Sequence, residues 1–340
     1  MLFGRRRAYL RKAAVAPFDG ICSGDITVIA AKEGLSPRLL PFIVQNESLF
    51  DHAVTNSAGS LSPRVKWQSL SQFEFELPNA DKQEELADIL WAAQETRSRY
   101  KQLLTACGDV VKITICLPEV CGMTRYLLGD LVRNCKEKVD RDNNPYEYFV
   151  AGDHMETERP RLTMRGRFDE ADVGPAFIRL FRPGQVLYGS RRTYLKKVSV
   201  ADFEGVTSNV TFVLETKDDS ILPQRLLPFL LLSDRFTSYS IGKSKGSTNP
   251  YVLFSDLADF EIDLPEPKTV AEIADIMCAA ERLKEDYRSL IATCDDVVKS
   301  QFVEMFGGPD PTESDCPPVT IGELAADMRY GTSKKASDSG

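Results

Sequence analysis

The sequence predicts an α+β fold in which strand-rich domains are joined by a pair of long helices that pack together as a coiled coil. Two segments carry apolar residues at alternating spacings of three and four, the heptad pattern of helices that lie along one another. The segments are copies of each other, since Leu86 and Ile273 begin the same pattern 187 residues apart. Short β-branched and apolar runs bounded by glycine and charged residues indicate strands.

The two helices are expected at residues 79–112 and 266–306, and a Leu-Pro pair precedes each of them. An ordinary amphipathic helix would explain either copy alone, but the duplication favours a pair that packs together. The side chains expected between the helices share the heptad stripe: Leu86, Ile89, Tyr100, Leu103, Ile273, Ile276, Leu283, Tyr287 and Leu290.

The repeat extends beyond the helices and sets the domain organisation. It covers residues 2–112 and 187–299, while Ile321-Gly322-Glu323-Leu324 repeats the pattern of Leu128-Gly129-Asp130-Leu131. A segment equivalent to residues 149–185 has no counterpart in the first copy. We therefore expect five regions, which are an incomplete domain (1–78), the first helix (79–112), a complete domain (113–265), the second helix (266–306), and a linker with the truncated start of a further domain (307–340).

The sequence leaves open whether the segments Met1–Pro78 and Val319–Gly340 come together. Small fragments bury little apolar surface, so the incomplete domain risks folding poorly.

Basic residues are concentrated in two stretches of an acidic chain. The net charge is −8, yet ten Arg and Lys against three acids between Arg159 and Lys197 give that stretch +7, and Arg5 to Lys12 adds five basic groups. Charge separated in this way predicts a positive surface. A solvated face with no ligand is the alternative.

Catalytic and membrane signatures are lacking in the sequence. No run of about 18 apolar residues and no signal peptide occurs, so we expect a cytoplasmic protein that does not enter the membrane. The chain has no phosphate-binding loop, and only His52 and His154 could serve histidine-based catalysis. Cys116 and Cys121 lack further ligands for zinc. We therefore expect no catalytic residue, no metal and no cofactor.

The remaining pattern is suited to binding nucleic acid. Paired arginines and flexible Ser/Asn/Lys loops can grip phosphates and read base edges, with arginine on guanine and asparagine on adenine. These residue types are also common in turns that bind nothing. The candidate DNA-binding residues are Arg191, Arg192, Lys196, Lys243, Lys245, Ser247, Asn249, Arg6, Arg7, Asn56 and Ser60.

These pieces occur in a recognisable order. Gly184-Gln185-Val186-Leu187-Tyr188 leads to Arg191-Arg192-Thr193-Tyr194-Leu195-Lys196-Lys197, and then come Gly205-Val206-Thr207-Ser208-Asn209, the Gly246-Ser247 loop and Leu264-Pro265 before a long helix. Each piece is weakly specific, but the order, repeated around two heptad helices, resembles the DNA specificity subunit of type I restriction-modification systems. The resemblance covers nearly the whole chain.

The resemblance implies two target-recognition domains held apart by an antiparallel pair of helices, with each domain reading half of a split site in double-stranded DNA. It also implies that the helices dock methyltransferase subunits, that a restriction subunit joins the complex, and that S-adenosylmethionine and ATP are bound by those partners. The chain itself would then be no enzyme. It departs from the family in its ends, so we expect a truncated or circularly permuted member whose specificity rests mainly on residues 124–265.

The alternative is a scaffold or decoy that binds the methyltransferase subunit through its helices without selecting DNA.

Overall fold

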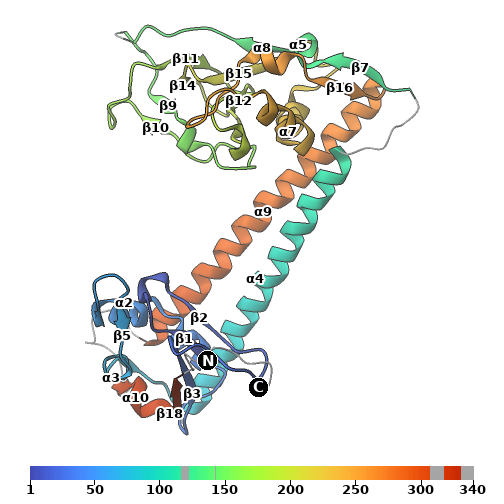
Figure 1. Cartoon of the computed structure of the whole chain (residues 1–340). Coiled ribbons are helices and arrows are strands. Elements are labelled where there is room, and N and C mark those ends of the chain that lie inside the picture. Colours follow the sequence, from blue (N-terminus) through green and yellow to red (C-terminus); the bar gives the residue numbers. More distant parts are fainter. Residues whose placement is uncertain (116–121, 142, 307–317, 331–340) are drawn as a thin grey trace, which may run out of the picture. The chain divides into compact units, whose positions relative to one another are not determined.

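A computed structural model describes residues 1–115, 122–141, 143–306 and 318–330, and its ribbon is shown in Figure 1. The chain divides into two compact units. The first unit comprises Met1–Gln102 and Arg288–Gly340, and the second comprises Leu103–Tyr287. Within the described ranges, no helix is both long enough and apolar enough to cross a membrane.

The main sheet of the second unit has four strands in the order β13-β12-β15-β8, and all neighbours are antiparallel. Helices pack over one face of it, around the rings of Tyr188, Phe236 and Phe260, which contact one another edge to face. The elements are β8 Val132–Cys135, β12 Val186–Gly189, η3 Thr193–Leu195, β13 Val198–Val200, β15 Thr211–Thr216, η4 Gln224–Leu226, α6 Leu227–Leu232, α7 Asp234–Lys243 and α8 Phe254–Ala258. A strand pair and a short helix lie beside them: β7 Thr124–Leu127, α5 Leu128–Leu131 and β16 Glu261–Leu264.

A second sheet packs against the other face of the main sheet in this unit. Its strands have the order β10-β9-β14-β11, and β9 runs parallel to β14. Leu187 of β12 and Val213 of β15 are fully buried against Phe181 and Val150 of the second sheet. The bounds are β9 Tyr148–Val150, η2 Gly152–His154, β10 Gly166–Arg167, β11 Phe177–Phe181 and β14 Gly205–Ser208.

The first unit is built around a sheet of order β18-β3-β1-β2. Its core contains Phe3 stacked on Phe50, with Leu39, Ile43 and Leu86 also buried. The elements are β1 Leu2–Gly4, η1 Ala8–Leu10, β2 Ala13–Ala14, β3 Ile26–Ala31, α1 Leu40–Val44, α2 Glu47–Thr55, β4 Ser57–Ala58, β5 Arg64–Val65, α3 Trp67–Leu70, β6 Glu74–Glu76, β17 Pro318–Thr320, α10 Ile321–Leu324 and β18 Ala325–Tyr330.

The sequence repeat is also a repeat of strand register. Leu2 lies opposite Ala14 on one side and Val28 on the other. Its counterpart Leu187, 185 residues later, lies opposite Ser199 and Val213, which are the counterparts of Ala14 and Val28. The two copies therefore place equivalent residues at equivalent points of their sheets.

Both ends of the described chain meet in the first unit. Strand β17 pairs with β6, and β18 pairs with β3, so residues 318–330 take the places that β7, α5 and β8 take in the second unit. Ile321 and Leu324 of α10 are buried in the first unit's core. The open question about the two segments is thus answered, because they share one sheet.

The long helices are α4 (Ala80–Ile115) and α9 (Pro267–Phe306), and they pack together. Asn79 caps α4 by accepting a hydrogen bond from the Lys82 amide at 3.0 Å, and Pro267 is the first residue of α9, where a proline costs no hydrogen bond. In the first unit, Arg97 pairs with Asp295 at 2.6 Å. In the second, Val111 packs on the cluster that holds Ala274. The residue numbers rise along one helix as they fall along the other, so the pair is antiparallel.

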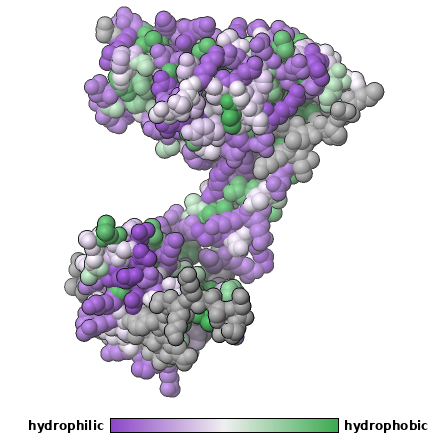
Figure 2. Space-filling view, in the orientation of Figure 1, coloured by the Kyte–Doolittle hydropathy of each residue, from purple (hydrophilic) through white to green (hydrophobic). Residues whose placement is uncertain are grey.

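The apolar heptad residues of the two long helices are only partly buried by the packing of the helices against each other. Leu86 is buried, whereas five of the expected core side chains remain between 38 and 50% exposed: Ile89, Leu103, Ile276, Leu283 and Leu290. Figure 2 shows apolar residues on the surface of the helices. Two helices can bury only the part of an apolar stripe that faces the other helix, so these residues form a half-covered surface.

Candidate nucleic-acid interface

A tight turn in the second unit presents two arginines. Arg191 and Arg192 follow β12 and lead into the turn η3, and Arg192 has a left-handed backbone (φ 50°), as does Lys196 (φ 47°) at the other end of the turn. The Arg192 amide donates to the carbonyl oxygen of Pro250 at 2.7 Å. The turn is therefore fastened to the Gly/Ser/Asn loop, which the sequence places about 50 residues away.

The polar loop 244–250 follows α7. Lys243 ends that helix with its ammonium 5.3 Å from the centre of the Tyr239 ring. Lys245 pairs with Asp256 at 2.7 Å, and the hydrogen bond from Lys245 lowers the pKa of Asp256. The turn at Gly246 needs a positive φ (87°), which glycine adopts without strain. Ser247 and Asn249 are exposed beyond it.

The basic side chains of the turn differ in whether they are already bonded to other residues of the protein. Within the described part of the chain, the guanidinium groups of Arg191 and Arg192 are exposed and make no hydrogen bond or ion pair. Lys196 is only 15% exposed and pairs with Glu158 at 2.7 Å and Asp234 at 2.6 Å. Burial opposes its charge, but the two carboxylates outweigh burial and raise the pKa of Lys196. Lys196 thus fixes the turn, whereas the arginines remain available to a ligand.

The first unit repeats this construction. The Arg7 amide donates to Pro63 at 2.7 Å, and Arg7 (φ 54°) and Arg11 (φ 49°) are again left-handed. The hydroxyl of Ser62 accepts from Arg6 Nε at 2.7 Å and from Arg7 Nε at 3.3 Å. These arginines are therefore already bonded to the loop beside them.

Other residues of this copy have structural roles or are open to solvent. Arg6 also lies 3.4 Å from Asp25. A hydrogen bond from Arg64 and the charge of Arg6 hold the pKa of Asp25 below its ordinary value. Asn56 ends α2 by donating to the His52 carbonyl at 2.9 Å, and Ser60 is exposed at the tip of the loop. The structure therefore brings the predicted residues of each copy together, but several of them are satisfied by neighbours.

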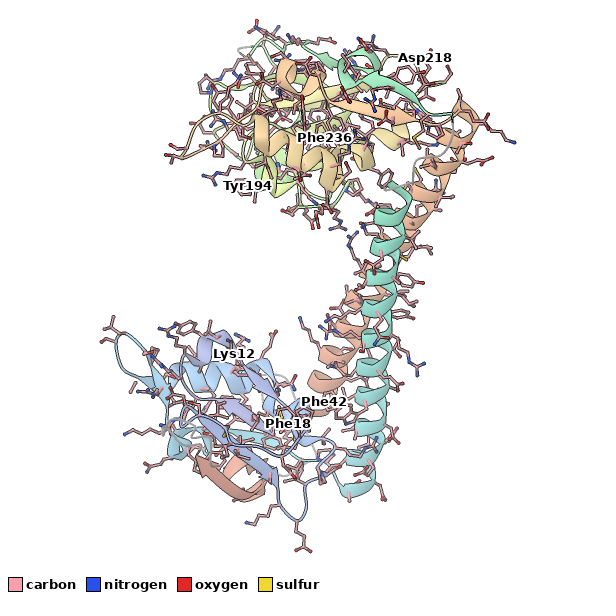
Figure 3. The ribbon with its side chains drawn as sticks, turned by 45° about the vertical axis from the view of Figure 1, so that its right-hand side comes forward. Lys12, Phe18, Phe42, Tyr194, Asp218 and Phe236 are labelled. Carbon is pink, nitrogen blue, oxygen red and sulfur yellow. The ribbon has the colours of Figure 1, made fainter. Side chains whose placement is uncertain are left out.

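Two tyrosines at the turns were missed as site residues by sequence reasoning. Tyr194, labelled in Figure 3, is 52% exposed inside η3, and its counterpart Tyr9 is 53% exposed inside η1. An exposed aromatic ring beside exposed arginines can stack on a base or donate its hydroxyl to one. The sequence repeat could have identified them, because both copies have a tyrosine at the same position of the turn, in Ala8-Tyr9-Leu10 and Thr193-Tyr194-Leu195.

The positive surface expected from residues 159–197 is smaller than the charge count suggests. Half of its ten basic residues are tied to carboxylates: Arg159, Arg167, Arg182, Lys196 and Lys197. Arg165 lies 3.9 Å above the ring of Tyr148, while Arg161 is exposed with no ion pair among the described residues. The other five, which have no ion pair among the described residues, are Arg161, Arg165, Arg179, Arg191 and Arg192. Of these, Arg179 is partly buried and donates a hydrogen bond to the Cys135 carbonyl oxygen at 3.3 Å.

No family model matches this chain, but curated proteins do. The specificity subunit of the type I restriction enzyme HindI from Haemophilus influenzae is 24% identical over 213 residues, or 59% of this chain and 46% of that protein. The EcoDI specificity subunit from Escherichia coli is 22% identical over 132 residues, or 38% of this chain and 29% of that protein. The chain spans less than half the length of these relatives.

Solved structures share the fold. The S subunit of a type I restriction-modification system from M. genitalium matches with a TM-score of 0.52 at 11% identity, covering 82% of this chain and 74% of that one. A chain from a structural study of complex assembly and conformational transition in the type I system matches with a TM-score of 0.50 at 18% identity, covering 90% and 81%.

The architecture is therefore that of a type I specificity subunit, with strand-rich domains and a pair of long antiparallel helices. The curated relatives of the chain are type I restriction enzyme specificity subunits, and the resemblance inferred from the sequence is confirmed.

Proposed function

We propose that this chain reads DNA sequence as the specificity subunit of a type I restriction-modification complex. The observation that carries the proposal is the fastening of an arginine turn to a polar loop, Arg192 to Pro250 and Arg7 to Pro63, at the same 2.7 Å in both units. Two copies of one surface suit a bipartite site with two half-sites.

In the second unit, Arg191 and Arg192 can fork onto phosphates or guanine, and Asn249 and Ser247 can meet base edges. The first unit would use Arg6, Arg7 and Ser60 in the same way. Its arginines must first give up their bonds to Ser62 and Asp25. We therefore propose that the second unit, within residues 124–265, supplies most of the specificity.

We further propose that the chain carries no catalytic group and that methyl transfer and cleavage belong to partner subunits. The half-exposed heptad residues support docking of a methyltransferase subunit on the helices. In the second unit these are Leu103, Ile276 and Leu283, and in the first they are Ile89 and Leu290. Exposed apolar surface of this extent commonly marks a protein interface.

The test is selection of a DNA site from a randomised bipartite library by the purified chain, followed by gel shift. The proposal expects one enriched bipartite site and a larger loss of affinity when one half is scrambled than when the other is. Equal losses would remove the dominant role of the second unit. No enrichment at any sequence, with normal binding of a methyltransferase subunit, would overturn DNA reading.

A second candidate function is a scaffold that binds a methyltransferase subunit and selects no DNA. The pairing of half of the basic residues of 159–197 with carboxylates favours it. The two functions differ in salt dependence, because DNA binding through phosphates releases counterions and weakens steeply with salt. A scaffold would assemble with its partner without that slope.

A further inference from the structure

The first unit has an open apolar face beside β1 and β2. Val15 is 48% exposed, Phe18 78% and Ile21 83%. Phe18 is labelled in Figure 3. Leu2 and Val28, on the adjoining strands, are also partly exposed. Exposure of this many large apolar side chains in one short segment is costly in water and marks a surface that another molecule covers.

The second unit shows what covers the same residues. Counterparts of Phe18 and Ile21 are Phe203 and Val206, and Val206 is fully buried. Phe203 contacts Tyr148 at 5.7 Å and Phe181 at 5.4 Å between ring centres. Strand β14 (Gly205–Ser208) is held between β9 and β11. The cover is thus a strand layer with aromatic side chains, formed by residues 147–182.

The first unit has a glycine, Gly20, at the position where the covering strands of the second unit leave room only for Gly205, although no described residue covers Gly20. A Cβ at Gly205 would meet the Tyr148 carbonyl oxygen at 2.8 Å and the Phe181 ring at 2.9 Å, so the covering strands exclude any larger residue. At the counterpart Gly20, a Cβ would meet only the Phe18 ring, at 3.4 Å. The segment therefore keeps the sequence features of a covered strand, while the described residues of the first unit include no cover.

We propose that this open face binds a segment of another polypeptide that resembles residues 147–182. The segment would supply two strands with aromatic side chains, one on each side of Phe18 to Ile21. A second copy of this chain is a poorer occupant. Each copy has two such apolar faces, one in each unit, but its described residues supply only one covering layer, residues 147–182. If one copy used its layer to cover the first unit of another, its own second unit would be left open instead. The partner is a different polypeptide that supplies half of a recognition domain by strand addition.

The full chain can be tested with a synthetic peptide of the sequence of residues 147–182. We expect the peptide to bind and to slow hydrogen exchange of the amides of residues 18–22. This readout involves no DNA, so it is independent of the function proposed above. A scrambled peptide of the same composition is the control and is expected to give no protection.

Two variants probe the fit. Gly20→Val is expected to fold normally, because its side chain has room in the chain alone, and to weaken peptide binding about tenfold or more, because the added methyl groups would occupy the place of the covering strand. Phe18→Ser with Ile21→Ser is expected to have the same effect by removing the apolar contact. Leu61→Ser, at a side chain that is 93% exposed in the same unit, is the matched control and should bind as the parent does.

Three results would overturn the proposal. The first is the absence of any peptide binding to a chain that is folded by circular dichroism. The second is equal binding by the parent, Gly20→Val and the double variant. The third is dimerisation of the parent in sedimentation that the double variant abolishes, since it would show that a second copy covers the face.

Discussion

The backbone amide of Arg192 donates a hydrogen bond to the carbonyl oxygen of Pro250, and this contact joins an arginine turn to a polar loop. The two arginines of the turn make no side-chain bond within the described residues. We expect Arg191→Ala with Arg192→Ala to weaken DNA binding by about 1 to 3 kcal/mol if base contacts are lost. The salt dependence of binding, measured by fluorescence anisotropy, should also become shallower.

The control for this double variant is Lys243→Ala with Lys245→Ala on the neighbouring loop. Both lysines are among the DNA-binding residues predicted from the sequence, but Lys245 is already paired with Asp256. We therefore expect a smaller loss for the lysine pair. Unchanged affinity for both double variants at low salt would exclude this surface from DNA binding.

Tyr194 offers a test of the turn itself. Its ring is about half exposed, so Tyr194→Ala should leave the free energy of unfolding unchanged within about 0.5 kcal/mol, as is usual for surface residues. DNA affinity should fall, because stacking on a base is worth about 1 to 3 kcal/mol. Tyr194→Phe separates the ring from the hydroxyl. Full affinity in the phenylalanine variant would assign the contact to stacking, and full affinity in the alanine variant would remove Tyr194 from the interface.

Lys196 should matter for stability more than for DNA. Lys196→Met removes two ion pairs from a largely covered side chain, while Glu158 and Asp234 remain in contact with solvent, so we expect a loss of about 1 kcal/mol in urea unfolding. Folding raises the pKa of Lys196 above its ordinary 10.5, so the stabilisation is complete well below pH 10.5 and is lost as the pH rises through the folded value. A variant as stable as the parent at pH 7 would contradict this role.

Leu283 tests the exposed side of the helices. Leu283 is one of the side chains that the sequence predicts between the helices, but it is 47% exposed, so Leu283→Asp would not bury a charge there. We therefore expect the variant to fold and to lose binding of a methyltransferase subunit in a pull-down. Ala279→Asp, at another exposed position of α9, is the matched control. Equal binding by both variants would mean that this surface is not the docking site.

Leu324 tests whether the two ends of the chain stabilise each other. It is buried in the core formed by the N-terminal strands, so Leu324→Ala should cost about 2 to 5 kcal/mol of the first unit's stability. Proteolysis within residues 1–78 should then become faster. Leu61→Ala, at an exposed leucine, should have no effect. Unchanged proteolysis in Leu324→Ala would indicate that the N-terminal strands fold without α10.

The sequence predicted the two long helices and the repeated domain because both are local or periodic signals. The heptads of Leu86 and Ile273 are visible without knowledge of the fold, and so is the offset between copies. The pattern could not show which side of the stripe stays open, since Leu86 and Ile89 are equally apolar. It also could not show that Lys196 is bound to Glu158 and Asp234, because each partner lies 38 residues away and only the folded chain brings it near.

The pairing of β18 with β3 sets the order in which the chain can fold during synthesis. The ribosome makes β3 about 300 residues before β18, an interval of roughly 15 to 60 s at about 5 to 20 residues per second. The second unit, whose strands all lie within residues 103–287, can form its core in that time. Strand β3 therefore obtains β18 as its neighbour only after the whole second unit has been made.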